Sequence, residues 1–209
     1  MMRRVRILPL YFLWALFALY PNPAMLGRSV PQGWDPSVDP VAVAAWAAEL
    51  PDDPAYIERQ VLDHYVPYSV PWQSYGVPWY YPTTREVVAR GQGDCQARAL
   101  VLASILERKG LPYRLEASFD HIWVWYPKKA PSAMENQSIA LLTNDGAGSE
   151  FQVPDQWDWR ESWRIEREYF WDAMPLDRKL LLFGGLLLIR LRRPVSHRLR
   201  RLVPVLTLR

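Results

Sequence analysis

The sequence predicts an α+β fold in which one helix packs on a small antiparallel sheet. Residues 95–109 form a run in which alanine and leucine recur every three to four positions, and this spacing indicates a helix with one buried face. Two short segments rich in aromatic and branched residues follow at 111–120 and 121–126, and this composition is typical of strands. This helix and these strands form the centre of the expected domain, residues 55–177.

The N-terminal part of the chain holds an uncharged segment of 21 residues, at positions 7–27, with three arginines before it. A membrane span needs about 20 apolar residues, and arginines beside a span stay on the cytoplasmic side. We therefore expect residues 1–27 to form an N-terminal transmembrane helix in the cytoplasmic membrane, with the main domain outside, either periplasmic or extracellular. A cleaved signal peptide is the alternative, but Asn22 interrupts the small-residue pattern expected before cleavage at Ala24.

A connecting segment rich in proline and alanine is expected at residues 28–54. The stretch between residues 28 and 177 holds all 22 acidic residues but only 13 of the 25 basic ones. An acidic domain lacks the basic surface on which nucleic-acid binding depends. We therefore expect no nucleic-acid partner.

The C-terminal segment, residues 178–209, combines an apolar run with nine basic residues. The apolar run, 180–189, lies between Lys179 and Arg190, and as a helix it would cover about 15 Å, half of a hydrocarbon core. A short span, a helix packed on the domain and a helix lying on anionic lipid all fit this pattern. We favour the last, because short apolar runs with arginines are common in interfacial helices, and we expect membrane lipid as a partner.

The single cysteine of the chain, Cys95, stands at the start of the helical run. Asp94 fits the N-cap of this helix, and Gly110 fits its C-terminal end. The positive end of a helix dipole lowers the pKa of a thiol in the first turn. We therefore expect Cys95 to be a nucleophile, with Gly91 and Gly93 allowing a substrate backbone to approach closely.

A nucleophilic thiol needs a general base, and the base needs an orienting group. His121 begins the second expected strand, 26 positions after Cys95, and Glu135 and Asn136 follow the loop at 127–131 as candidates for the orienting group. One cysteine and three scattered histidines show no metal-ligand spacing, and the chain has no glycine-rich phosphate loop. We therefore expect neither a metal nor a cofactor.

A Gly-Asp-Cys sequence opens the helix, Gly-Leu-Pro-Tyr-Arg follows it, and His-Ile-Trp-Val forms the second strand. Together these motifs resemble the transglutaminase-like superfamily, over roughly residues 55–145. The resemblance implies a papain-like Cys–His–Asp core with Cys95 as nucleophile and His121 as base. The family usually carries an aspartate where this chain offers Glu135 and Asn136. Asparagine fills this role in papain-like enzymes, so Asn136 is slightly favoured over Glu135.

These features predict a membrane-anchored cysteine acyl-transfer enzyme that faces the outside of the cytoplasm. Cys95 would attack an amide or peptide carbonyl of a protein or peptide substrate, and hydrolysis or transamidation would follow. The backbone N–H of Cys95 and a donor in the segment from Gln73 to Tyr80 would bind the oxyanion.

The alternative is a non-catalytic, membrane-anchored scaffold subunit that uses this fold to bind and stabilise an integral-membrane protein complex. Three features favour this alternative: the apolar segments near both ends that could associate with a membrane, the 11 Trp and 11 Tyr residues, and the missing aspartate.

Overall fold

The computed structural model describes residues 8–132, 134–146, 148–154 and 158–199. Its architecture is α+β, with helices around one four-stranded antiparallel sheet. The chain divides into two compact units. The larger unit comprises residues 24–173, and the described part of the smaller unit comprises residues 8–23 and 174–199.

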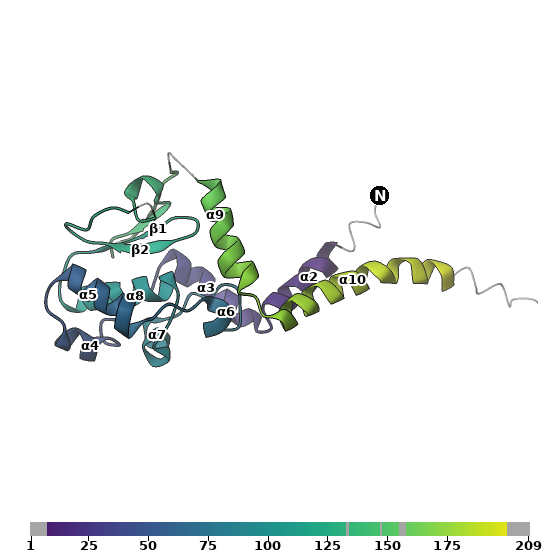
Figure 1. Ribbon diagram of the computed structural model, residues 1–209, viewed down its shortest axis with the longest axis horizontal. Coiled ribbons are helices and arrows are strands. Elements are labelled where there is room, and N and C mark those ends of the chain that lie inside the picture. The colour runs from purple at the N-terminus through teal and green to yellow at the C-terminus, as the bar shows by residue number, and fades with distance from the viewer. Residues whose placement is uncertain (1–7, 133, 147, 155–157, 200–209) are drawn as a thin grey trace, which may run out of the picture. The chain divides into compact units, whose positions relative to one another are not determined.

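The sheet of the larger unit is antiparallel throughout (Figure 1). Its strands are β1 (Arg114–Ala117), β2 (Ile122–Trp125), β3 (Leu142–Asn144) and β4 (Ser149–Phe151), in the order β2-β1-β3-β4. The backbone carbonyl of His121 turns toward β1 and accepts from the Ser118 N–H at 2.8 Å. Because backbone groups alternate along a strand, residues 122 and 124 direct theirs to the free edge of β2. This free edge is where the candidate site is built.

The larger unit also contains several helices, most of them short. They are α3 (Pro23–Trp34), α4 (Ala44–Glu49), α5 (Pro54–Gln60), α6 (Pro71–Ser74), α7 (Thr84–Arg90), α8 (Cys95–Arg108) and α9 (Trp159–Glu166), with the 3-10 helix η2 (Gln137–Ile139) and the π-helical turns η1 (Val61–Tyr65) and η3 (Arg167–Asp172). Residues 28–54, which we expected to form a connecting segment, supply α4 and the buried core residues Val43, Ala47 and Leu50. They are therefore part of the folded unit.

Helix α8 is the central helix of the larger unit. Asp94 caps its N-terminus by accepting a hydrogen bond from the Ala97 N–H at 3.1 Å. Nine of its 14 residues are buried, because β1 and β2 lie on one side of it and α4, α5 and α7 pack on others. Leu115 of β1 and Val124 of β2 pair across the sheet and join the same hydrophobic core.

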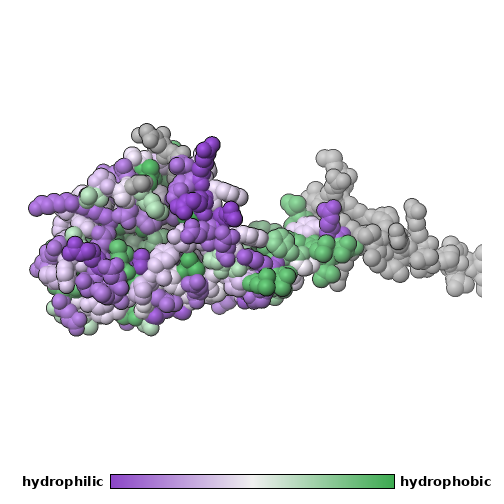
Figure 2. Space-filling model, viewed as in Figure 1, coloured by the Kyte–Doolittle hydropathy of each residue, from purple (hydrophilic) through white to green (hydrophobic). Residues whose placement is uncertain are grey.

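The smaller unit is a pair of helices, α2 (Leu8–Leu19) and α10 (Leu176–Leu199). The indole Nε1 of Trp14 donates to the backbone carbonyls of Leu181 and Leu182, at 3.1 and 3.2 Å. Gly185 lies directly against the Trp14 ring. Large apolar side chains elsewhere on both helices are exposed, and Figure 2 shows them gathered over this pair.

The expected N-terminal transmembrane helix is wrong. Helix α2 has 12 residues, or about 18 Å at 1.5 Å per residue, against a hydrocarbon core of about 30 Å. It ends at Leu19, and a new helix begins at Pro23, because proline breaks the helical hydrogen-bond ladder. Among the helices that the structure describes, none has the length and apolar character that a bilayer crossing requires.

Three further expectations depended on this transmembrane helix: the single-pass anchor, the membrane and transmembrane assignment, and the location in the cytoplasmic membrane with the domain outside. They are wrong for the same reason. The arginines used to orient that anchor, Arg3, Arg4 and Arg6, lie outside the described residues. So do three of the basic residues used to argue for a lipid-bound C-terminal segment: Arg200, Arg201 and Arg209.

Candidate active site

Cys95 is the first residue of α8 and keeps part of its surface exposed. Burial of the thiol and, to a smaller extent, the neighbouring Asp94 carboxylate raise its pKa to about 12. Backbone N–H groups, led by that of Ile122 on the free edge of β2, lower the pKa but do not outweigh burial. The expectation of a thiol activated by the helix dipole is therefore corrected, because desolvation exceeds the dipole contribution.

Asp94, next to the thiol, is also buried, with 4% of its surface exposed. Burial raises the pKa of Asp94 to about 6, although the N–H groups of Ala97 and Gln96 that it caps pull the pKa down. A carboxylate held inside the protein by a helix N-terminus thus shares the first turn with the thiol. Its negative charge favours the neutral form of Cys95.

His121 is held at the entrance to β2 by the turn between β1 and β2. Its N–H donates to Ser118 Oγ at 3.1 Å, and Ser118 Oγ donates to Asp120 Oδ1 at 2.8 Å. The other oxygen of Asp120 accepts from Ser162 on α9 at 2.7 Å. The imidazole ring stacks on Trp123, with 6.0 Å between ring centroids. Ser118 and Asp120 of the turn, together with helix α9, therefore fix the backbone that carries the imidazole.

The imidazole of His121 contacts Glu135, whereas Asn136 is used elsewhere. His121 Nε2 lies 3.2 Å from Glu135 Oε1. Asn136 Oδ1 accepts from the Ser138 N–H at 3.0 Å and caps η2. Neither residue lies in a strand, since β3 begins only at Leu142. Burial acts to raise the pKa of Glu135, but hydrogen bonds from His121 and Lys129 outweigh it and hold the pKa below its usual value.

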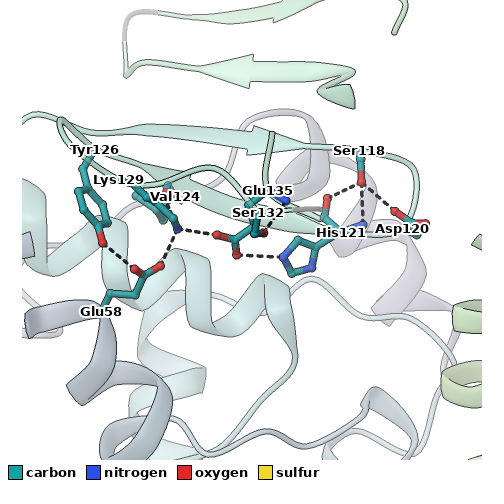
Figure 3. Close-up of polar contacts among 9 residues, drawn as sticks. All are labelled: Glu58, Ser118, Asp120, His121, Val124, Tyr126, Lys129, Ser132 and Glu135. Atoms are coloured by element: carbon teal, nitrogen blue, oxygen red, sulfur yellow. Dashed lines mark hydrogen bonds and ion pairs between the residues drawn. The ribbon is translucent and has the colours of Figure 1, made fainter. Parts of the chain in front are cut away.

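A buried lysine extends this contact to helix α5 (Figure 3). Lys129 Nζ lies 2.8 Å from Glu135 Oε2 and 2.6 Å from Glu58 Oε1, and donates to Val124 O at 2.9 Å. Tyr126 donates its hydroxyl proton to Glu58 Oε2 at 2.6 Å. Lys129, Glu58 and Tyr126 were not among the residues that the sequence indicated. The loop at 127–131 holds two adjacent lysines, and nothing local distinguishes the buried one from its neighbour.

The arrangement thus provides a thiol at a helix N-terminus and an imidazole with an ionised carboxylate on one of its nitrogens, which are the groups that nucleophilic acyl transfer requires. The His121–Glu135 contact is the one direct side-chain hydrogen bond that the structure records among Cys95, His121, Glu135, Asn136 and Gln73, all of which it describes. Comparisons of the chain with protein-family models, with curated proteins and with solved structures gave no match.

Gln73, considered as an oxyanion donor, lies on α6 with its side chain exposed. Its backbone N–H donates to Val70 O at 2.9 Å. The contacts of Gln73 therefore hold α6 together and do not reach the thiol, and the backbone N–H of Cys95 is the remaining oxyanion candidate.

The two glycines before Cys95 shape the backbone. Gly91, with φ 66°, ends α7 in the left-handed region that glycine tolerates best. Gly93 lies against Ala97, and a Cβ at this position would overlap the Ala97 side chain. Its carbonyl and N–H bond to Ser69 N and Pro67 O, at 2.9 and 3.2 Å. Both glycines therefore set the path of the chain into α8.

Turn η3 places an aromatic side chain against Tyr68, whose phenol is close enough to Cys95 for their charges to interact. Tyr169 of η3 meets Tyr68 edge-on at 5.7 Å, and Arg98 of α8 lies over the Tyr68 ring at 4.9 Å. Burial raises the pKa of Tyr68, so its phenol stays neutral. Within the described residues, no group of three or more His, Cys, Asp or Glu side chains is arranged to hold a metal ion.

Proposed function

We propose that residues 24–173 form a transglutaminase-like cysteine acyl-transfer domain that acts on amide or peptide carbonyls. The observation that carries the proposal is the 3.2 Å contact between His121 Nε2 and Glu135 Oε1. A carboxylate on one imidazole nitrogen orients the ring and leaves Nδ1 as the base.

In this mechanism the Cys95 sulfur attacks the substrate carbonyl carbon while His121 Nδ1 takes the thiol proton. The carbonyl oxygen becomes an oxyanion that the Cys95 backbone N–H stabilises. As the intermediate collapses, the carbon–nitrogen bond breaks and the imidazolium returns the proton to the leaving amine. Water or a second amine then attacks the thioester and releases Cys95 as the thiol. Glu135 stays ionised and stabilises the imidazolium throughout.

The raised pKa of Cys95, about 12, supports a resting neutral thiol. Proton transfer to His121 then accompanies attack and does not precede it. This separates the proposed domain from enzymes that store a thiolate–imidazolium pair before the substrate arrives.

The test uses p-nitrophenyl acetate as an activated acyl donor, with intact-mass spectrometry as the readout. We expect one acetyl group on the protein, its loss in Cys95→Ala, and transfer of the acyl group to added dansylcadaverine or to water. The ratio of these two products distinguishes transamidation from hydrolysis. If the wild-type protein stays unacetylated under conditions that acetylate free cysteine, the proposal is wrong.

A second candidate is a non-catalytic interaction module. The burial that raises the pKa of Cys95 favours it, because an inert buried thiol behaves as a small apolar side chain. Under this candidate Cys95→Ala leaves the fold and its interactions unchanged, and the wild-type protein shows no acyl transfer.

A further inference from the structure

The ammonium group of Lys129 is largely buried and lies among three oxygens. The side chain has 9% of its surface exposed. Its Nζ contacts Glu58 Oε1 at 2.6 Å, Glu135 Oε2 at 2.8 Å and Val124 O at 2.9 Å. An ammonium group carries three N–H donors, so these three oxygens fix its orientation completely.

Both oxygens of each carboxylate beside Lys129 have a partner. Glu135 receives His121 on Oε1 and Lys129 on Oε2, and Glu58 receives Lys129 on Oε1 and Tyr126 on Oε2. Figure 3 shows the resulting line of contacts from the tyrosine hydroxyl to the imidazole. Charge-assisted hydrogen bonds of this kind are about twice as strong as neutral ones.

The backbone brings Lys129 to this place through a tight turn at the end of β2. The Lys129 N–H donates to Tyr126 O at 3.1 Å, and Lys128 between them has φ 69°. The turn folds the chain back so that the Lys129 side chain returns to the free edge of β2 at Val124. Lys128 itself is exposed. Two adjacent lysines thus differ completely in their surroundings.

We propose that Lys129 is a positioning residue of this site: its ammonium group fixes the Glu135 carboxylate against the His121 imidazole and ties both to helix α5 through Glu58. The inference rests on the proposed function, because an oriented imidazole matters only where it acts as a base.

Glu135 needs such support because it sits in a bend outside any helix or strand. A glutamate side chain also has one more rotatable bond than an aspartate side chain, so it needs more support to hold one position. An ionised Glu135 accepts a hydrogen bond from His121 Nε2–H and leaves Nδ1 free to act as the base. A protonated Glu135 could donate to Nε2 and drive the ring to the opposite tautomer. The adjacent cation keeps the carboxylate ionised and so selects the useful tautomer.

The test follows the His121 tautomer and the Glu135 titration in the full chain, by long-range 1H–15N spectra and 13C carboxyl shifts. His121→Gln assigns the signal among the three histidines. In Lys129→Met we expect the Nε2–H tautomer to lose population and the Glu135 midpoint to rise by about one pH unit or more. Lys128→Met removes the same charge one position away and should leave both readouts unchanged.

A double variant, Glu58→Gln with Lys129→Met, removes one charge of each sign and covers the case in which the single variant unfolds. It should show the same two shifts. If either folded variant keeps the wild-type tautomer and Glu135 midpoint, the positioning role is wrong.

Acetylation of Cys95 by p-nitrophenyl acetate separates this inference from the proposed function. We expect the rate to fall roughly 10-fold to 100-fold in Lys129→Met, by analogy with the hydrogen-bond partners of metal-binding histidines, and to stay unchanged in Lys128→Met. If the His121 tautomer shifts in Lys129→Met but the wild-type protein is not acetylated, only the enzyme proposal is overturned. Wild-type acetylation with no change in Lys129→Met overturns the role of Lys129 alone.

Discussion

His121 Nε2 and Glu135 Oε1 lie 3.2 Å apart, although the two residues are 14 positions apart and neither belongs to a helix or strand. Two separate loops therefore have to be held in place for this contact to exist. Ser118 and Ser162 hold the histidine side, the latter through Asp120, and Lys129 holds the glutamate side. The contact depends on groups spread over much of the larger unit.

Glu135→Gln should impair acyl transfer far more than Asn136→Ala. Removing the negative charge takes away the stabilisation of the imidazolium and the preference for one tautomer. By comparison with other triads we expect a loss of about 10²–10⁴ in kcat. Asn136→Ala should keep activity within about twofold and cost roughly 1 kcal/mol of stability through the lost η2 cap. Cys95 acetylation rates and urea unfolding measure the two effects. Equal loss of activity in both variants would contradict the assignment.

Alkylation of Cys95 by iodoacetamide should be slow at neutral pH and should still be rising at about pH 10, because only the thiolate reacts and burial raises its pKa to about 12. The same thiol in urea should reach half of its maximal rate near its ordinary pKa of about 8.5 and level off above it. As Cys95 is the single cysteine, mass spectrometry reads the reaction without ambiguity. A rate that levels off below about pH 8 in the folded protein would show a stored thiolate instead.

Asp94→Asn should stabilise the protein at neutral pH. The pKa of Asp94 is raised from 3.8 to about 6 in the folded state, so the folded protein binds this proton more tightly than the unfolded chain. Stability linked to Asp94 is therefore fully present below about pH 4 and is lost as the pH rises through about 6. Asparagine caps a helix about as well as aspartate and carries no charge.

The gain in unfolding free energy should be roughly 1–3 kcal/mol at pH 7 and much smaller at pH 4. Urea unfolding at both values measures it. Because the Asp94 charge raises the pKa of Cys95, the variant should also react faster with iodoacetamide. An equal gain in stability at both pH values would mean that it does not come from the raised pKa of Asp94.

Helix α8 could be predicted from the sequence because its signals are local. Asp94 at the cap, alanine and leucine at helical spacing and Gly110 after the last turn lie within one continuous stretch. The segments that became β1 and β2 carry a similarly local signal. The pKa of Cys95 could not be predicted this way, because the helix dipole is a local effect whereas burial depends on the whole fold.

The preference for Asn136 over Glu135 came from the asparagine of papain-like enzymes, whereas the contact with His121 depends on how the loop around Glu135 folds. Lys129 was missed because its partner Glu58 lies 71 positions away. The N-terminal error has a different cause. Residues 7–27 carry no charge, but Pro21 and Pro23 follow α2 after only 12 residues, and absence of charge says nothing about where a helix ends.

Gly185→Ala should destabilise the α2–α10 pair, whereas Gly184→Ala should stabilise it. A Cβ at Gly185 would overlap the Cε2, Nε1 and Cζ2 atoms of Trp14, while a Cβ at Gly184 would meet no atom within 4 Å. Overpacking of this kind costs about 1–3 kcal/mol. Replacing a helical glycine by alanine in open space instead gains about 0.5–1 kcal/mol. The two variants add the same methyl group to adjacent residues, so their difference isolates the contact with Trp14.

Amide hydrogen exchange along α2 measures both effects in the full chain. Protection of α2 should fall in Gly185→Ala and rise or stay constant in Gly184→Ala. Trp14→Phe should reduce the destabilisation caused by Gly185→Ala, because the smaller ring leaves room for the added methyl group. On its own, Trp14→Phe also removes the hydrogen bonds to Leu181 and Leu182. Since Trp14 and Gly185 are in contact, the effects of their substitutions should not add. Additive effects, or equal losses of protection in both alanine variants, would mean that α2 is held on α10 by other contacts.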